Sequence, residues 1–336
     1  MTGTSRGAAR WALVTGGAGG IGAHLVVALR KKGWSVRVLD NLSSGKLENL
    51  APVREDPQVE VVRTDVTDLA QIEKHFEGVE FVWHLSANPD VRRGGQETDL
   101  DLVQGTVATR NVLEAMRRKK VERIAFSSSS VVYGHPKTFP TPEDYGPLFP
   151  ESLYGASKLG SEALITAFCH SFGIRAWIFR FANVVGPGAT HGVIYDFLRK
   201  LEKTPDRLEV LGDGKQSKGY LWVEDCVQAM IFATEHAEEK VNVFNLAPED
   251  QISVAEIAKR VIEITGSKAR IEYTGGARGW PGDVPVQKLS VDRLKALGYT
   301  AKYGSREVVD MAVRSLHAEL TTHAPPAKTS SVPRSR

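Results

Sequence analysis

Tyr154 and Lys158 are the two residues whose types and spacing point most directly to chemistry, because side chains four positions apart on a helix lie on one face. Apolar residues recur at helical spacing between Ala156 and Ala167, so we expect a helix that continues to His170. A free phenol has a pKa near ~10, and an ammonium group within a few Å lowers that pKa. Such a pair can take a proton from a hydroxyl group while a hydride leaves the same carbon. The same spacing also occurs in solvated surface pairs, so the rest of the chain has to separate the two interpretations.

The composition indicates a globular protein without a marked charge. The chain has 336 residues, enough for one large domain or two linked ones, and its net charge of +3 is too small to indicate nucleic-acid binding. No apolar run approaches the ~20 residues of a membrane span, and the N-terminus lacks the apolar middle of a signal peptide. Cys169 and Cys226 show no metal-like spacing and are interpreted as buried free thiols. We therefore expect a cytoplasmic protein that has no metal site and binds neither nucleic acid nor membrane.

A glycine-rich turn follows the first predicted strand, residues 11–15. Gly16, Gly19 and Gly22 precede a predicted helix over 23–32, and the next strand ends at Asp40. In this context the glycines permit a tight turn, a close approach of the backbone to a pyrophosphate, and packing of helix on strand. The helix N-terminus supplies free N–H donors to the phosphates. Asp40 would accept hydrogen bonds from the adenosine ribose, which favours NAD over NADP; alternatively, it caps the turn that follows.

Further buried strands alternate with helices along the first half of the chain. This alternation requires a parallel, doubly wound (Rossmann) sheet of the α/β class, whose ligands bind at the carboxyl ends of the strands. His84 lies inside one apolar strand and is interpreted as a hydrogen-bonded core histidine. The strand that contains His84 is predicted over residues 81–85, and the other predicted strands are residues 35–39, 59–63, 123–126, 175–181 and 241–246.

Four serines, Ser127 to Ser130, follow the fifth strand and precede Tyr154 by about two dozen residues, so a hydroxyl could reach the reacting oxygen. With the glycine turn, Asp40 and the segment 180–187 (RFANVVGP), this run is similar to the extended short-chain dehydrogenases/reductases. Within them the chain most resembles the UDP-glucose 4-epimerase branch of the NAD-dependent sugar-nucleotide epimerase/dehydratase family. The resemblance covers about residues 12–318.

The resemblance implies a role for each matching residue. The catalytic residues would be Ser129, Tyr154 and Lys158. Tyr154 would act as the base, and Lys158 would hold the nicotinamide ribose. Arg278 would grip the substrate diphosphate with its fork of donors, or is a surface charge in a glycine-rich loop. The implied NAD contacts are Gly16, Gly19, Gly20, Ile21, Gly22, Asp40, Asn41, Ser44, Gly45, Asp65, Val66, Leu85, Ser86, Ala87, Ser127, Tyr154 and Lys158. The implied substrate contacts are Ser129, Asn183, Gly192, Val193, Lys218 and Arg278.

Several positions depart from the family pattern. Lys218 and Gly219 replace an arginine and an acid, which puts one diphosphate contact in doubt because lysine lacks the fork of donors. Gly20 replaces an aromatic residue of the phosphate loop, and Gly105 stands where an asparagine near the nicotinamide is common. Trp280, like Trp222, flanks the expected nucleotide pocket and is interpreted as packing there.

The domain division follows from the same resemblance. Residues 9–182 form the expected NAD-binding domain, with later segments returning to its sheet. Residues 183–320 mainly form a smaller substrate-binding domain, and 321–336 are expected to be a disordered tail because of their Pro, Ser, Thr and basic content. Two long helices, near Leu100 and Tyr154, would form a homodimer interface.

The resulting hypothesis is an NAD-dependent epimerase of a nucleotide-diphosphate sugar, most simply UDP-glucose/UDP-galactose, acting through a transient 4-keto intermediate. Epimerases of another nucleotide sugar, such as UDP-glucuronate, and a sugar-nucleotide dehydrogenase remain open. A dehydratase would need an acid–base pair where Ser130 and Val131 stand. A cofactor-sensing protein without turnover would typically lack the tyrosine or the lysine, and both are present here.

Overall fold

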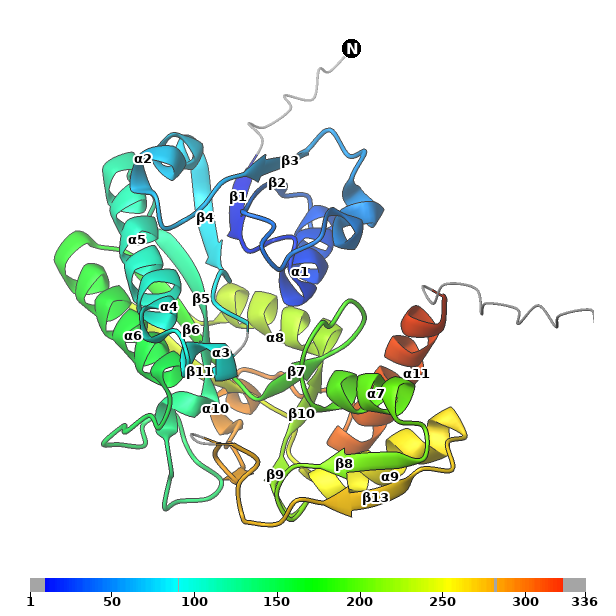
Figure 1. Ribbon diagram of the computed structural model, residues 1–336. Helices are drawn as coiled ribbons and strands as arrows, with labels where there is room; N and C mark the ends of the chain where they lie inside the picture. The colour runs from blue at the N-terminus through cyan, green and yellow to red at the C-terminus, as the bar shows by residue number, and fades with distance from the viewer. Residues whose placement is uncertain (1–9, 90, 281–282, 323–336) are drawn as a thin grey trace, which may run out of the picture.

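The computed structural model describes residues 10–89, 91–280 and 283–322, and its centre is a seven-stranded sheet in the order β11-β6-β5-β4-β1-β2-β3 (Figure 1). All neighbouring strands run parallel, which confirms the predicted doubly wound α/β sheet. Apart from the edge strand β3, the strands are rich in β-branched and aromatic residues and are largely buried between two layers of helices, as expected of a parallel sheet. Their bounds are β1 Trp11–Thr15, β2 Ser35–Asp40, β3 Val59–Arg63, β4 Val79–His84, β5 Arg123–Ser129, β6 Arg175–Phe181 and β11 Val241–Leu246.

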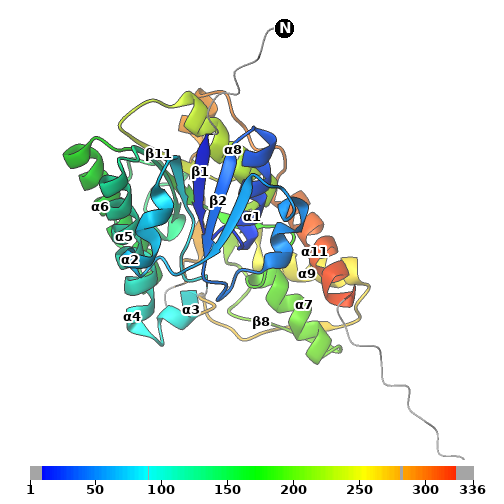
Figure 2. The same ribbon diagram turned by 90° about the horizontal axis from the view of Figure 1, so that it is seen from above.

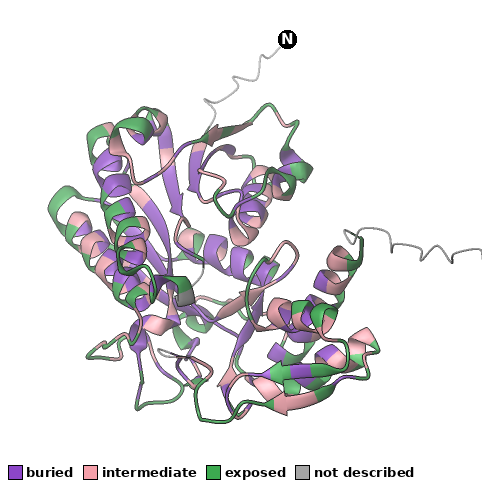
Figure 3. Ribbon diagram, in the orientation of Figure 1, coloured by how far each residue is buried: buried purple, intermediate pink, exposed green. Residues whose placement is uncertain are grey.

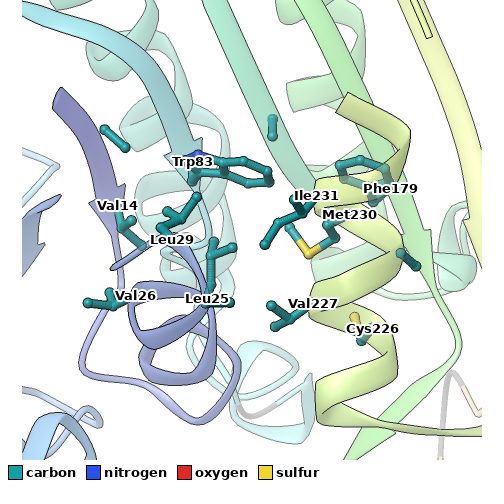
Figure 4. Packing of buried hydrophobic residues seen from close by; sticks show 14 of the residues in the cluster. Val14, Leu25, Val26, Leu29, Trp83, Phe179, Cys226, Val227, Met230 and Ile231 are labelled. Carbon is teal, nitrogen blue, oxygen red and sulfur yellow. The ribbon is translucent and has the colours of Figure 1, made fainter. Parts of the chain in front are cut away.

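One face of the sheet is covered by α1 (Gly20–Lys31) and α8 (Val223–His236). Their apolar sides meet Trp83 and Phe179 of the sheet, as Figure 4 shows, and Leu25 and Leu29 are fully buried there. Burying one such leucine side chain contributes about 1.5–3 kcal/mol to the stability of the fold. This packing fixes the N-terminus of α1 directly behind the glycine-rich turn.

The opposite face is covered by α5 (Ala108–Lys119) and α6 (Leu153–Phe172), with the short α2 (Leu69–Ile72) beside them. Figure 2 shows these helices on one side of the strands and α1 and α8 on the other. Outward-facing positions of the helices are exposed while the strands between them are buried (Figure 3). Because α6 lies against β5 and β6, its inner face reaches the carboxyl end of the serine-bearing strand.

The predicted helix near Leu100 is not one regular α-helix. The chain forms α4 (Thr98–Asp101), then a π-helical segment, Leu102–Val107, and only then α5. Inside the π segment Gly105 packs against α6, where an added Cβ would lie 2.2 Å from Ser157 Oγ. A π segment of this kind is common near functional sites.

A smaller unit at the C-terminal side has its own core, built by α7 (Val193–Lys203), α9 (Val254–Thr265) and α11 (Ser305–Thr322). Helix α9 begins with a capping box, in which the Ser253 and Glu256 side chains each accept from the other's backbone N–H. The short strands around this core are β7 Asn183–Val185, β8 Arg207–Val210, β9 Ser217–Lys218, β10 Tyr220–Trp222, β12 Ile252–Ser253, β13 Arg270–Tyr273 and β14 Val286–Gln287. The remaining helices are α3 Val91–Gly94 and α10 Asp292–Ala296, with 3-10 turns at Leu47–Val53, Glu73–Phe76 and Ser130–Tyr133.

The two units are interleaved along the chain. Strand β11 pairs with β6, and α10 contacts β11, so parts of the chain beyond 183 complete the sheet of the first unit. The division at 182 and 320 therefore stays a prediction. Helix α11 runs to Thr322, one residue past the predicted start of the tail, and residues 323–336 of that tail lie outside the described residues.

Both cysteines are free and buried, as predicted. Over the ranges that the structure describes, every helix is too short or too polar to cross a bilayer.

Candidate active site

Helix α6 presents Tyr154 and Lys158 toward the end of β5. Ser152 begins the helix, since its hydroxyl accepts from the backbone N–H of Gly155 at 3.0 Å. Tyr154 then lies in the first turn and Lys158 in the second. The Lys158 ammonium donates to the carbonyl oxygen of Ser127 at 2.6 Å and lies 5.6 Å from the centroid of the Tyr154 ring. The predicted convergence of the two side chains is therefore present in the structure.

The electrostatics of this pair differ from the simplest expectation. Burial, with a contribution from Asp101, raises the pKa of Tyr154 above its usual value. Burial also lowers the pKa of Lys158 to about 7, although Glu162 and Asp101 act in the opposite direction. The phenol is therefore not activated by the fold alone, because the ammonium that should stabilise its phenolate is itself only partly charged near neutral pH.

Ser129 is the serine of the run whose hydroxyl remains available. Its oxygen accepts weakly from Val131 N at 3.4 Å, and no acceptor for its hydrogen is found among the described residues. The other three hydroxyls donate to parts of the fold: Ser127 to His84 O, Ser128 to Glu162 and Ser130 to Phe181 O. The structure thus distinguishes one hydroxyl of four as free to serve a ligand.

His84 is a core histidine, as predicted. Thr15 Oγ1 lies 2.7 Å from its Nδ1 and Thr109 Oγ1 lies 3.0 Å from its Nε2. Because Thr15 Oγ1 already accepts from the backbone N–H groups of Leu85 and Ser86, its own hydrogen goes to Nδ1, and Nε2 then donates to Thr109. Burial and the charge of Lys158 lower the pKa of His84 to about 3, so the ring stays neutral.

One large cavity joins these groups. It has a volume of about 590 Å³ and extends from the glycine-rich turn, past the end of β5, to the N-terminus of α7 and to Lys218 of β9. Every residue predicted to contact NAD lines it. Five of the six predicted substrate contacts also line the cavity, namely Ser129, Asn183, Gly192, Val193 and Lys218.

The glycine-rich turn is shaped for close approach of a ligand. Gly16 has a φ of +69°, and a Cβ there would meet Ser86 N at 2.9 Å. A Cβ at Gly22 would lie 2.1 Å from Gly16 O, which is incompatible with the turn. The N-cap of α1 is Gly19, without a side-chain cap, so the first N–H groups of the helix face the cavity.

Asp40 serves the fold and still faces the cavity. Its carboxylate accepts from Ala18 N at 2.9 Å and Leu42 N at 2.8 Å, so the alternative interpretation as a turn cap is part of its role. A carboxylate has about four lone-pair directions, and two therefore remain for ribose hydroxyls. Together with the glycine cradle, this donor and acceptor set fits NAD.

The substrate half of the cavity is held together by an ion pair that the sequence did not reveal. Lys218 Nζ lies 2.8 Å from Asp283 Oδ1, and the Asp283 side chain is 3% exposed. The lysine also lies over the Trp280 ring, which lines the cavity, whereas Trp222 belongs to the core of the smaller unit.

Gln216 was also missed by sequence reasoning. It lines the cavity with a buried Oε1 that has no donor among the described residues; its place two residues before Lys218 was the only available signal.

Arg278 does not reach the cavity. Its guanidinium pairs with Glu151 at 2.7 Å and is 45% exposed. Its position matches the alternative interpretation as a surface charge, and the diphosphate contact stays a prediction. Gly105 likewise faces Ser157 of α6 and does not line the cavity, while Gly20 does line it, with only Gly188 O within 4 Å of an added Cβ. No cluster of metal-binding side chains was found within the described part of the chain.

Comparisons with known proteins agree with this geometry. Residues 12–247 match the model of the NAD dependent epimerase/dehydratase family. The chain is 32% identical to a putative UDP-glucose 4-epimerase of Methanocaldococcus jannaschii, over 90% of this chain and 96% of that protein.

Two solved structures show the same fold over nearly the whole chain. A crystal structure of a UDP-galactose 4-epimerase has 38% identity and a TM-score of 0.83, covering 92% of this chain and 99% of that one. The UDP-glucose 4-epimerase of Thermotoga maritima, solved with UDP-glucose, has 31% identity and a TM-score of 0.83, with the same coverage of 92% and 99%. The predicted fold, family and cofactor are thereby confirmed: the chain belongs to the NAD dependent epimerase/dehydratase family.

Proposed function

We propose that this protein is an NAD-dependent epimerase of a nucleotide-diphosphate sugar that interconverts UDP-glucose and UDP-galactose through a transient 4-keto sugar. One observation carries the proposal: Tyr154, Lys158 and the available hydroxyl of Ser129 border the same cavity as the glycine cradle and Asp40. When bound, NAD supplies a reversible hydride acceptor. The relatives named as UDP-glucose and UDP-galactose 4-epimerases support the choice of sugar.

Each catalytic side chain has a distinct task. Tyr154 takes the proton of the sugar hydroxyl during oxidation and returns one during reduction. Ser129 donates a hydrogen bond to the same oxygen and holds it in place. Lys158 stabilises the Tyr154 phenolate, which the burial of Tyr154 otherwise disfavours. No net redox change results, because the keto sugar is reduced again on its other face.

The substrate is held by its diphosphate, at the end of the cavity away from Tyr154. The N-terminus of α7 begins at Gly192, which has no side-chain cap, so its first N–H groups can bind a phosphate. Asn183 adds an amide, and Lys218 keeps two of its three N–H donors for a phosphate while Asp283 takes one. Anchoring at the diphosphate leaves the keto sugar free to turn over, as inversion requires.

A panel of nucleotide sugars tests the proposal. Purified protein incubated with each sugar, without added reductant, should interconvert UDP-glucose and UDP-galactose with no change in mass. Loss of one water would identify a dehydratase, although Ser130, 2% exposed and bonded to Phe181 O, offers no acid or base for it. Conversion of UDP-glucuronate alone, or no turnover with any sugar, would contradict the proposed substrate.

We also propose that the protein is a homodimer. The π-helical segment exposes Leu102, Val103 and Val107, with exposed fractions of 52%, 40% and 39%, and Leu153 and Phe172 of the adjacent α6 are exposed as well. Apolar side chains gathered on two neighbouring helices favour burial against a second copy. Sedimentation at micromolar concentration should give a dimer that Val103→Glu weakens; a monomer of the unaltered chain would contradict this assembly.

The proposed location is the cytoplasm. Its support is that Cys169 and Cys226 are free and buried, which suits a reducing compartment. Cell fractionation tests it, with recovery outside the cytoplasmic fraction as the contrary result.

A further inference from the structure

A buried ionic cluster lies directly beneath the catalytic groups. Glu162 of α6 and Arg180 of β6 form a two-pronged ion pair, with Nε–Oε1 and Nη2–Oε2 distances of 3.0 and 2.7 Å. Both side chains are buried, with exposed fractions of 7% and 6%. Ser128 Oγ donates to the same carboxylate at 2.5 Å. Three elements that build the cavity, α6, β5 and β6, are therefore joined at one carboxylate.

The residues of this cluster lie on the same helix face and the same strand as the catalytic residues. Tyr154, Lys158 and Glu162 are each four positions apart on α6, so they lie along one face of the helix. On β5, the carbonyl of Ser127 accepts from Lys158, the hydroxyl of Ser128 donates to Glu162, and Ser129 lines the cavity. Lys158 and Glu162 thus dock on consecutive residues of the same strand.

A charged lysine is costly in this position, and the mechanism needs the charge. Lys158 is 2% exposed, and burial alone would favour the neutral amine. A fixed carboxylate one turn away opposes that effect, and an arginine and a hydroxyl prevent the carboxylate from turning away.

We propose that Glu162, clamped by Arg180 and Ser128, is a positioning residue that favours the charged form of the Lys158 side chain and directs it at Ser127 and Tyr154. The inference rests on the proposed function for its catalytic meaning. The charge state of Lys158 itself can be measured without turnover.

Other groups also face Lys158, and they define what the experiment must separate. Asp101 of α4 acts in the same direction as Glu162. His84 of β4 is neutral, so it adds no charge. Tyr154 is a neutral phenol in the resting chain. Arg180 donates to Glu162 and to the backbone carbonyl of Glu143.

A purely structural role for the ion pair makes a different prediction from an electrostatic one. Removing either partner of a buried pair leaves an uncompensated charge and destabilises the fold. If Lys158 only sensed that damage, Glu162→Gln and Arg180→Met would change its pKa in the same direction. Under the proposal, Glu162→Gln lowers the pKa of Lys158. Arg180→Met removes a positive charge while Ser128 still holds the carboxylate, so it leaves the pKa of Lys158 unchanged or raises it.

The test is a pH titration of the Lys158 side chain by NMR, in protein carrying ¹³C at the lysine Cε positions, with Lys158→Arg identifying the resonance. Glu162→Gln should lower the midpoint by about one pH unit. Glu143→Gln is the matched control: it is an equally buried carboxylate in the same region, and Arg180 donates to its backbone carbonyl. In that control the midpoint of the Lys158 titration should not change. An unchanged midpoint in Glu162→Gln, or a fall of similar size in Arg180→Met or Glu143→Gln, would overturn the proposal.

A double variant covers the case in which the single ones do not fold. Glu162→Gln with Arg180→Met removes both charges and leaves no buried ion unpaired. The Lys158 midpoint should still fall, and an unchanged midpoint would again overturn the inference. Where turnover is present, the alkaline limb of the kcat profile should move down in pH with the midpoint, while KM stays within about twofold. Failure of the proposed function would show as absent turnover in the unaltered protein, with the shift of the Lys158 midpoint intact.

Discussion

The catalytic half and the substrate half of the cavity differ in what holds their side chains. In the first, Tyr154 and Lys158 are presented by a regular helix against a parallel strand, and Ser129 stands at that strand's end. In the second, Lys218 belongs to a two-residue strand and pairs with Asp283. Arg278, which was predicted for this half, lies in a loop outside the cavity and pairs with Glu151. Regular elements fix the direction of a side chain through their period, whereas in loops it depends on which partner lies nearby. The residues predicted for the first half therefore all line the cavity, whereas Arg278, predicted for the second, does not, and its contact stays a prediction.

Tyr154→Phe should have the largest effect. Loss of the proton carrier should reduce kcat by about 10²–10⁴-fold, with NAD still bound. Tyr133→Phe is the matched control, because Tyr133 is a buried phenol bonded to Asn245 that does not line the cavity. The control should lose about 1 kcal/mol of stability and keep its turnover. Equal activity of Tyr154→Phe and the unaltered protein would remove the catalytic role.

Gly22→Ala tests the cofactor cradle. The added methyl would meet Gly16 O at 2.1 Å, so the turn must open and NAD should be lost or bound at least about tenfold more weakly. Isothermal calorimetry with NAD measures the change. Gly146→Ala serves as the control, because an added Cβ there meets nothing within 4 Å. Gly33→Ala would be a poor control, because Gly33 has a φ of +83°, which strains any other residue. Unaltered NAD affinity in Gly22→Ala would contradict the cradle.

Lys218→Met compared with Arg278→Ala sharpens the contrast between the halves most directly. Lys218 lines the cavity, so its loss should raise KM by about 5–150-fold, equivalent to about 1–3 kcal/mol, with kcat nearly unchanged. The readout is initial-rate kinetics over a range of substrate concentrations. A KM for Lys218→Met within twofold of the unaltered protein would place the diphosphate elsewhere.

Arg278→Ala should have the smallest effect. Its ion pair with Glu151 is exposed, and such pairs contribute about 0–1 kcal/mol to stability. KM should stay within about twofold, and thermal unfolding should change by only a few degrees. A large rise in KM would mean that Arg278 exchanges Glu151 for the substrate and that the sequence-based assignment was correct.

Much of the fold follows from sequence because the signals are local and repeated. The alternation of strands and helices determined the parallel sheet, and Gly16, Gly19 and Gly22 marked the cofactor turn by their spacing between a strand and a helix. The pair on α6 was predictable for the same reason: its geometry is that of any helix. The choice of Ser129 among four serines came from the family resemblance, and the hydrogen bonds of the other three now supply a physical reason.

The parts that sequence reasoning missed depend on contacts between distant segments. Asp283 pairs with a lysine 65 positions away, and no local pattern indicates such a partner. The π-helical segment at Leu102–Val107 keeps the apolar spacing of an ordinary helix, so only its packing reveals it. The pKa of Tyr154 was predicted to fall from its neighbour's charge, but burial, which a sequence does not show, raises it.

The central claim is that a hydride leaves the sugar and returns to the other face of the same carbon, within one cavity. The most direct measurement follows UDP-glucose deuterated at C4 in ordinary water. The account predicts UDP-galactose that retains the deuterium at C4, with no release of reduced cofactor or keto sugar. Loss of the label to solvent, or its accumulation in free reduced cofactor, would contradict it.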